Sequence, residues 1–274
     1  MKMQGITLKL GPAEKKRLKA LLTKKGRSQY GQFLAEGVRL LEESLRFNSL
    51  PVTLYYSRAE MNERGLKLVS LFERQGVKCL EIAAKDINQL SDARTSQGLI
   101  GLFNIPQYGS GEIAGGKYGR ILMLDGVSDP GNAGALIRSA LAFGFDLVLG
   151  SGETVDLYNP KVVRSSAGAI FGIPVSAGSL ADAAVLKKHQ NYAVIITDPR
   201  GGNIRTRMRK FKAGKRLILA IGSEAEGISA ELRSLADYSI RIEHSAVVES
   251  LNAAVAGSIL MKEIYELTAR RSKP

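Results

Sequence analysis

Three segments of the sequence place polar and charged side chains directly after predicted strands, where they could do chemistry. The first, LDGVSDPGNAGALIRSALAFG, spans residues 124–144 and opens an apolar helix at Asn132, an expected N-cap. Arg138 is the only charged residue between positions 130 and 145. A guanidinium on such a helix needs solvent, an acid or a bound anion, because an unpaired buried charge is costly. Arg138 is therefore a candidate for anion binding or catalysis, although an arginine that reaches solvent fits the same pattern.

The second segment, LAIGSEAEGIS at residues 219–229, follows a strand that is wholly apolar. Gly222 has no side chain and would let a ligand approach the backbone. Glu224 could pair with Arg138 or orient a substrate hydroxyl. A turn that caps a helix at 229–236 would account for the same residues.

The third segment, IRIEHSAVVESLNAAVAGSIL at residues 240–260, leads from a strand into the last helix. Ser250 is the expected N-cap of this helix, with Leu251 and Asn252 directly after it. The free N–H groups at such a helix end can bind an anion or a polar ligand. Capping alone is the simpler explanation of Ser250.

Several enzyme classes are disfavoured by what these segments lack. The stretch GVSDPGNAG does not have the G-x-G-x-x-G spacing of a nucleotide-binding oxidoreductase, and no GK[ST] follows it. Two histidines and one cysteine are too few for a zinc site built by the protein, so we expect no metal. No run of about 18 apolar residues is present, which predicts no membrane span. The single Cys79 and the lack of a signal-like N-terminus favour the cytoplasm.

The second half of the chain alternates strands with helices, as a scaffold for these segments requires. Its strands are rich in Val, Ile and Leu, which is typical of a mostly parallel sheet buried on both faces. Ligands of such sheets bind at the carboxyl ends of the strands. The predicted strands are 120–126, 145–150, 173–178, 192–198, 216–222 and 238–243, and the predicted helices are 132–144, 159–168, 180–189, 229–236 and 250–269.

The first half predicts a smaller α/β domain, with helices at 12–25, 37–47, 60–75 and 84–91 and strands at 52–57, 78–82 and 98–105. Residues 107–119 contain five glycines and predict a flexible linker. We therefore expect an N-terminal domain at 1–106, a linker at 107–119 and a catalytic domain at 120–274.

The net charge of +13 indicates a nucleic-acid partner, because 39 basic residues face 26 acidic ones. The basic residues gather at 1–30 and 200–216, and such clusters suit a phosphate backbone better than a scattered surplus does. Tyr30 and Phe33 could stack on bases, although core packing is the more ordinary role for an aromatic side chain. The candidate RNA contacts are Lys15, Lys16, Arg17, Lys24, Lys25, Arg27, Arg205, Arg207 and Arg209.

Taken together, the three segments resemble the three motifs of the SpoU class of RNA methyltransferases in the SPOUT superfamily. The resemblance covers residues 120–265. Asn132 and Arg138 match the first motif, Gly222, Ser223 and Glu224 the second, and Ser250, Leu251 and Asn252 the third.

This resemblance implies a trefoil-knot catalytic domain, a homodimer, and transfer of a methyl group from S-adenosylmethionine to a ribose 2′-hydroxyl of RNA. It implies Arg138 as the base, but a guanidinium rarely gives up its proton, so a clamp on the adjacent phosphate fits the physics better. In the mechanism we expect, Asn132, Glu224 and Asn252 position the ribose and Arg138, and Ser250 holds a phosphate or the cofactor edge. The implied cofactor contacts are Thr197, Gly201, Gly222, Ile242 and Leu251.

The first half resembles the ribosomal-protein-like substrate-binding domain that is often fused to this class, through residues 33–45 and 94–102. That likeness favours ribosomal RNA over transfer RNA. One departure lies at Ile242-Glu243-His244, where the family usually has I-P-M. It leaves open a non-catalytic RNA-binding or ribosome-assembly factor with a degenerate cofactor pocket, and cofactor binding separates the two hypotheses.

Overall fold

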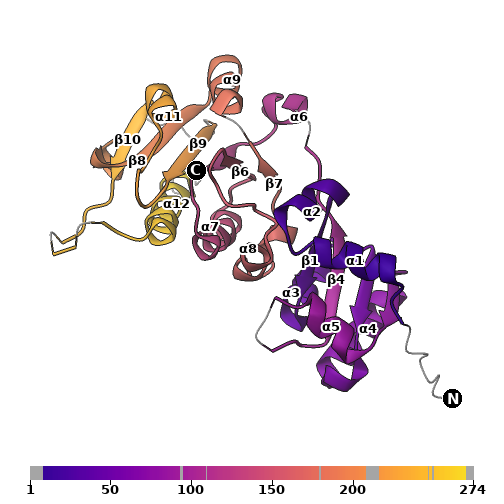
Figure 1. Ribbon diagram of the computed structural model, residues 1–274. Coiled ribbons are helices and arrows are strands. Elements are labelled where there is room, and N and C mark those ends of the chain that lie inside the picture. Colours follow the sequence, from indigo (N-terminus) through magenta and orange to yellow (C-terminus); the bar gives the residue numbers. More distant parts are fainter. Residues whose placement is uncertain are drawn as a thin grey trace. The chain divides into compact units, whose positions relative to one another are not determined.

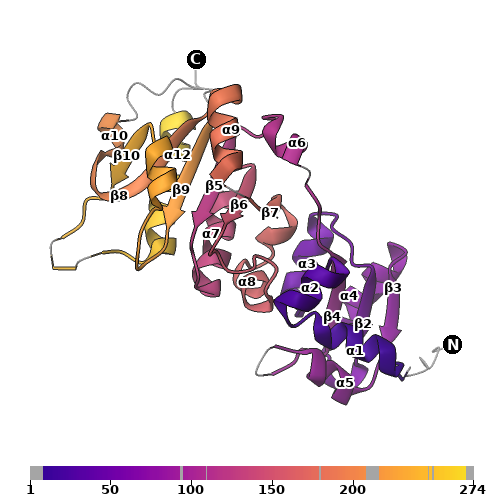
Figure 2. The ribbon, with the colours of Figure 1, turned by 45° about the horizontal axis from the view of Figure 1, so that its top comes forward.

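A computed structural model of the chain describes residues 9–92, 95–108, 110–178, 180–207, 216–245, 247–248 and 250–269. The chain forms two compact units (Figures 1 and 2). The N-terminal unit consists of Met1–Ile105 together with Tyr158–Gly172, and the C-terminal unit consists of Pro106–Leu157 and Ile173–Pro274.

The N-terminal unit is a four-stranded sheet in the order β1-β4-β2-β3. Strand β4 is antiparallel to both β1 and β2, and β2 is parallel to β3. One face carries Leu34, Tyr55 and Ile100, which pack on leucines and an isoleucine of α1 and α5. Its strands are β1 Gln32–Glu36, β2 Thr53–Tyr56, β3 Lys78–Glu81 and β4 Leu99–Asn104, and its helices are α1 Pro12–Ala20, α2 Lys24–Tyr30, α3 Val38–Arg46, η1 Arg58–Glu60, α4 Glu63–Arg74, α5 Ala84–Leu90, α8 Pro160–Ser165 and η2 Ala169–Phe171.

Two features of this unit differ from the sequence prediction. The basic helix expected at 12–25 is two helices, because the Thr23 side chain accepts a hydrogen bond from the backbone N–H of Gly26 and begins α2 anew. Strand β1 was not predicted. Its three central residues, Phe33, Leu34 and Ala35, are all buried, so the strand shows no alternation of apolar and polar side chains, and β1 is defined by its pairing with β4 along the whole strand.

A third difference is that Tyr158–Gly172 joins the N-terminal unit, although it lies between two strands of the C-terminal sheet in the sequence. Aromatic rings hold it there. The Phe33 ring lies 4.8 Å from the Tyr158 ring, and the Phe103 ring lies 4.8 Å from the Phe171 ring, measured between centroids. Phe33 is therefore a core residue, as expected for an aromatic side chain that is 2% exposed.

The C-terminal unit is a six-stranded sheet in the order β10-β8-β9-β5-β6-β7, and every neighbouring pair is parallel. Helices α9 and α11 cover one face and α7 and α12 the other (Figures 1 and 2). Its strands are β5 Arg120–Asp125, β6 Leu147–Ser151, β7 Val175–Ala177, β8 Ala193–Asn203, β9 Leu217–Gly222 and β10 Tyr238–Arg241, and its helices are α6 Ser110–Ala114, α7 Pro130–Ala142, α9 Leu180–Gln190, α10 Ile204–Arg207, α11 Ala230–Leu235 and α12 Ala253–Ala269. The predicted α/β class with a mostly parallel sheet is confirmed.

The glycine-rich stretch 107–119 is part of the C-terminal unit rather than a free linker. It contains helix α6, and Ile113 and Tyr118 are buried in the same core cluster as Ala183 and Leu186 of α9. Two apolar side chains are enough to dock the segment, even though its glycine content is typical of a flexible one.

Strand β8 contains an irregularity that shapes the carboxyl edge of this sheet. Ser239 of β10 is opposite Ile196, but the next residue, Ile240, is opposite Gly202. Residues 197–201 are therefore left out of the pairing between β8 and β10. Irregularities of this kind bend a strand and redirect its side chains, and they are frequent beside functional sites.

Within the described ranges, no helix has the length and apolar character needed to cross a membrane.

Candidate active site at the carboxyl edge of the parallel sheet

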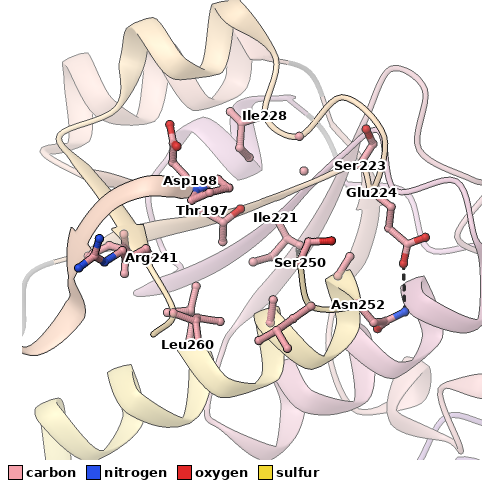
Figure 3. Close-up of a pocket in the computed structure, with 18 of the residues that line it drawn as sticks. Thr197, Asp198, Ile221, Ser223, Glu224, Ile228, Arg241, Ser250, Asn252 and Leu260 are labelled. Carbon is pink, nitrogen blue, oxygen red and sulfur yellow. Dashed lines mark hydrogen bonds between the residues drawn. The ribbon is translucent and has the colours of Figure 1, made fainter. Parts of the chain in front are cut away.

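A cavity of about 1260 Å³ lies at the carboxyl edge of the C-terminal sheet (Figure 3). Three segments form most of its wall: residues 197–200 in β8, residues 221–228 from the end of β9 into the following loop, and residues 240–244, 248 and 250–253 between β10 and α12. Carboxyl edges of parallel sheets are the usual ligand sites of such folds. Of the predicted cofactor contacts, Thr197, Gly222, Ile242 and Leu251 line this cavity.

Asn132, Glu224 and Asn252 form a hydrogen-bonded cluster beside the cavity, which we call the polar triad. Asn132 Nδ2 donates to Glu224 Oε1 at 2.7 Å. Asn252 Nδ2 donates to the same oxygen at 3.0 Å and lies 2.9 Å from Asn132 Oδ1. Figure 3 shows Glu224 and Asn252 pointing toward each other at one end of the cavity. The triad thus brings together one residue from each of the three predicted motifs.

Both helix starts near the triad differ from the prediction. Helix α7 begins at Pro130, and the carboxylate of Asp129 accepts the hydrogen bond from the backbone N–H of Asn132. The Asn132 side chain therefore does not cap α7, and its amide group donates a hydrogen bond to Glu224 instead. At α12, Asn252 Oδ1 accepts from the backbone N–H groups of Ala254 and Val255 at 2.9 and 3.2 Å. Asn252 thus occupies the position expected for Ser250.

Two predicted cofactor glycines are required by backbone packing. A Cβ atom on Gly222 would lie 2.2 Å from the backbone carbon of Gly227, so this position has to be glycine for the 222–227 loop to close. Gly201 does not line the cavity. A Cβ on it would lie 2.6 Å from the backbone nitrogen of Ile240, so the close approach that requires glycine there is to β10.

The opposite end of the cavity from Glu224 carries a buried acid that the sequence analysis did not single out. Asp198 is 7% exposed and lines the cavity, where it pairs with Arg233 and accepts a hydrogen bond from the Arg200 backbone N–H at 2.8 Å. Burial acts to raise the pKa of the Asp198 carboxyl, but the Arg200 hydrogen bond and the Arg233 guanidinium outweigh it, and the pKa is lowered. The sequence signal that could have identified Asp198 is an acidic residue directly after an apolar run.

Arg138 is exposed on α7 and does not line the cavity. Glu224, its suggested partner, instead accepts hydrogen bonds from the two asparagines of the triad. Ser250 lines the cavity and is exposed, as are Glu243 and His244, where the sequence departs from the family pattern. Arg241, which also lines the cavity, approaches Glu243 at 3.9 Å.

The predicted RNA contacts differ in their exposure and in their partners. Arg27 is 2% exposed and donates to the Leu21 carbonyl, so it is a structural residue and its prediction as an RNA contact is wrong. The close packing of α1 on α2 buries the Arg27 side chain. Lys15 pairs with Asp86, and Arg205 pairs with Glu263. Lys16, Lys24, Lys25 and Arg207 are exposed, Arg17 is partly buried, and Arg209 lies outside the described residues.

Among the described residues, no group of three or more His, Cys, Asp or Glu side chains could hold a metal ion. The site is built from amides, carboxylates and guanidinium groups beside aliphatic side chains. Such a set can bind a polar organic ligand and orient a hydroxyl group by hydrogen bonding.

Comparison with known proteins agrees with this fold. Residues 119–262, more than half of the chain, match the model of the SpoU rRNA methylase family. The chain therefore belongs to the SpoU rRNA methylase family. Residues 14–101 match an MRM3-like substrate binding domain.

Similar proteins and solved structures match most of the chain. The 23S rRNA (guanosine(2553)-2'-O)-methyltransferase RlmP of Bacillus subtilis is 29% identical over 243 residues, which cover 89% of this chain and 92% of that protein. The crystal structure of the SpoU methyltransferase AviRb from Streptomyces viridochromogenes in complex with AdoMet superposes with a TM-score of 0.80 at 25% identity, over 96% of this chain and 100% of that one. An AdoMet-bound rRNA methyltransferase from Sinorhizobium meliloti gives 0.80 at 27% identity, over 96% and 98% of the two chains.

Proposed function

We propose that this protein transfers a methyl group from S-adenosylmethionine to a ribose 2′-hydroxyl of RNA, with ribosomal RNA as the substrate. The observation that carries the proposal is the polar triad beside a cavity that Thr197, Gly222, Ile242 and Leu251 line. Family membership and the named activities of the relatives point the same way. An intact triad also argues against a degenerate, non-catalytic site.

The residues of the cavity fit S-adenosylmethionine. Ile221, Ile242, Leu251 and Leu260 supply aliphatic surface for a purine ring, and the carboxylate of Asp198 offers an acceptor in a buried position. The volume of about 1260 Å³ exceeds the roughly 300–1,000 Å³ typical of small-molecule sites. That excess leaves space for part of a nucleotide. When bound, the cofactor supplies a methyl group activated by a sulfonium centre.

The protein's own contribution is to orient the attacking hydroxyl and to stabilise the negative charge that develops on its oxygen. We assign the triad to hold the ribose, because its hydrogen bonds fix the rotation of all three side chains. A guanidinium rarely gives up a proton in a protein, so we assign Arg138 to clamp the adjacent phosphate and stabilise the developing alkoxide. Its exposed position on α7 leaves it accessible to an RNA backbone.

We assign RNA capture to the N-terminal unit. Lys16, Lys24 and Lys25 are exposed on its first two helices, and Tyr30 is 40% exposed at the end of α2. Lysines of this kind attract phosphates without sequence preference, and an exposed tyrosine can stack on an unpaired base.

We further propose a homodimeric, cytoplasmic enzyme whose C-terminal part forms a trefoil knot. Val255, Ile259 and Tyr265 leave apolar surface exposed along α12, at 49%, 38% and 46%, and a second copy would cover it. Light scattering after gel filtration is expected to give about twice the 29.6 kDa chain mass. A Val255→Glu, Ile259→Glu variant should give the single-chain mass, whereas a wild type of that mass would exclude the dimer.

Calorimetric titration with S-adenosylmethionine and S-adenosylhomocysteine tests the function. We expect saturable binding by the wild type and by Leu71→Asp, an exposed leucine of α4 in the N-terminal unit, but not by Leu251→Asp. Methyl transfer to purified ribosomal RNA, located by resistance of the modified ribose to alkaline cleavage, then tests the reaction itself. Absence of cofactor binding by the folded wild type would favour a non-catalytic RNA-binding factor.

A further inference from the structure

Asp125 is a buried carboxylate to which neither the motifs nor the cavity assign a role. It is the last residue of β5, it is 7% exposed, and it does not line the cavity. Its Oδ1 accepts a hydrogen bond from Ser151 Oγ at 2.9 Å, and its Oδ2 accepts one from the Ser229 backbone N–H at 2.7 Å. The ends of β5 and β6 and the loop after β9 therefore meet at one side chain.

The connection to β9 closes the loop that carries Glu224. In the pairing of β5 with β9, Asp125 is opposite Gly222, where that loop begins. Its carboxylate holds Ser229, where the same loop ends. Between these points, Ser223 and Gly227 exchange two backbone hydrogen bonds, at 3.0 and 3.1 Å, which make the loop a tight turn. Asp125 thus holds both ends of a segment whose interior is already closed.

The same residue is also connected to the other side of the triad. Asp125 leads directly into the loop 126–129, after which α7 begins at Pro130 and carries Asn132 in its first turn. That loop is fixed in turn by Thr154, whose hydroxyl donates to the Leu124 carbonyl at 2.8 Å and accepts from the Gly126 N–H at 3.1 Å. The Asn132–Glu224 hydrogen bond joins the first turn of α7 to the loop after β9, and the start of α7 and this loop both depend on this corner of the sheet.

We propose that Asp125 is a positioning residue for methyl transfer, which sets the place of Glu224 relative to Asn132 without touching substrate or cofactor. The inference rests on the proposed function. Loss of the carboxylate would leave the Ser229 N–H without its buried acceptor and release one end of the loop. Displacement of a catalytic group by about 1 Å can lower turnover on the order of 100-fold.

The conservative variant distinguishes positioning from charge. In Asp125→Asn, the amide oxygen can accept from Ser229, while the amide nitrogen can donate to Ser151, whose own proton can go to the Leu124 carbonyl 3.2 Å away. We expect this variant to keep turnover within about threefold of wild type. Asp125→Ala should lower turnover about 30-fold or more, with the KM for RNA unchanged within about threefold.

Asp146→Ala is the matched control. Asp146 Oδ2 accepts from the backbone N–H groups of Gly119 and Arg120, both at 2.8 Å, at the opposite end of the same strand. Its loss should lower the melting temperature and leave turnover per folded molecule within twofold of wild type. Amide exchange should quicken at Ser229 in Asp125→Ala and not in Asp146→Ala.

The experiment measures turnover, KM for RNA, melting temperature and amide exchange for the wild type and these three variants. Equal turnover of folded Asp125→Ala and Asp146→Ala would overturn the proposal, as would an Asp125→Asn variant as impaired as Asp125→Ala. If Asp125→Ala does not fold, Asp125→Glu, which keeps the charge but moves it outward by one methylene, takes its place under the same criterion. A wild type without methyl transfer would instead refute the proposed function.

Discussion

Asn252 connects the start of helix α12 to the carboxylate of Glu224. Its Oδ1 accepts from the first backbone N–H groups of the helix, and its Nδ2 lies 3.0 Å from Glu224 Oε1. One side chain therefore both begins a helix and orients a candidate catalytic acid. These two roles can be separated by mutation, because only the second requires a donor.

Asn252→Asp should separate them. An aspartate still caps α12, but it cannot donate to Glu224 and places a second negative charge beside it. We expect turnover to fall at least about tenfold, with less loss of stability than in Asn252→Ala, which should lose about 1 kcal/mol of unfolding free energy. Methyl-transfer kinetics and urea unfolding measure the two effects, and full activity of the folded aspartate variant would exclude a role for the amide.

Arg138→Lys should lower turnover about 100-fold, because lysine lacks the planar guanidinium that binds a phosphate in a bidentate manner. Calorimetry should give unchanged cofactor affinity, since Arg138 is exposed and does not line the cavity. Arg74→Lys, at an exposed position on α4, is the control. Near-full turnover of the Arg138 variant would contradict both the clamp and the base assignments.

Asp198 should make stability depend on pH. Its folded pKa is lowered from an ordinary value of 3.8, so its contribution is present above about pH 4 and is lost as the pH falls through the folded pKa. Asp198→Asn should therefore destabilise the protein by about 1–3 kcal/mol at pH 7 and by progressively less below pH 4. Urea unfolding at a series of pH values provides the measurement, and a constant difference between wild type and variant would contradict the assignment.

Lys24→Gln, Lys25→Gln should weaken RNA binding and reduce the slope of log affinity against log salt by roughly 1.4–1.8, because each phosphate contact contributes about 0.7–0.9. Lys67→Gln, Lys78→Gln, at exposed positions elsewhere in the N-terminal unit, should leave the slope unchanged. Filter binding over a range of salt concentrations tests this, and equal slopes for the two double variants would refute RNA binding by α2.

The sequence by itself determined the class of fold and the chemical groups of the site. Continuous apolar runs at β5, β8 and β9 predict a buried parallel sheet, because such strands need cover on both faces. Residues directly after these strands then share one edge of the sheet, so the motif residues were expected to meet there. The spacing of apolar residues within one strand or helix is a local property of the chain, and a single sequence records such local spacing directly.

Tertiary structure decided which of these residues touch and which are buried. Asn132 and Glu224 are 92 positions apart, and their hydrogen bond depends on the strand order that places β9 beside β5. Arg27 reads as one more cation of a basic cluster, but it is buried by the packing of α1 on α2. Asp125 is not among the residues that match the family motifs, and its role depends on Ser151 at the end of β6 and Ser229 in the loop after β9. Such contacts form only when distant segments pack together, so no spacing along the chain encodes them.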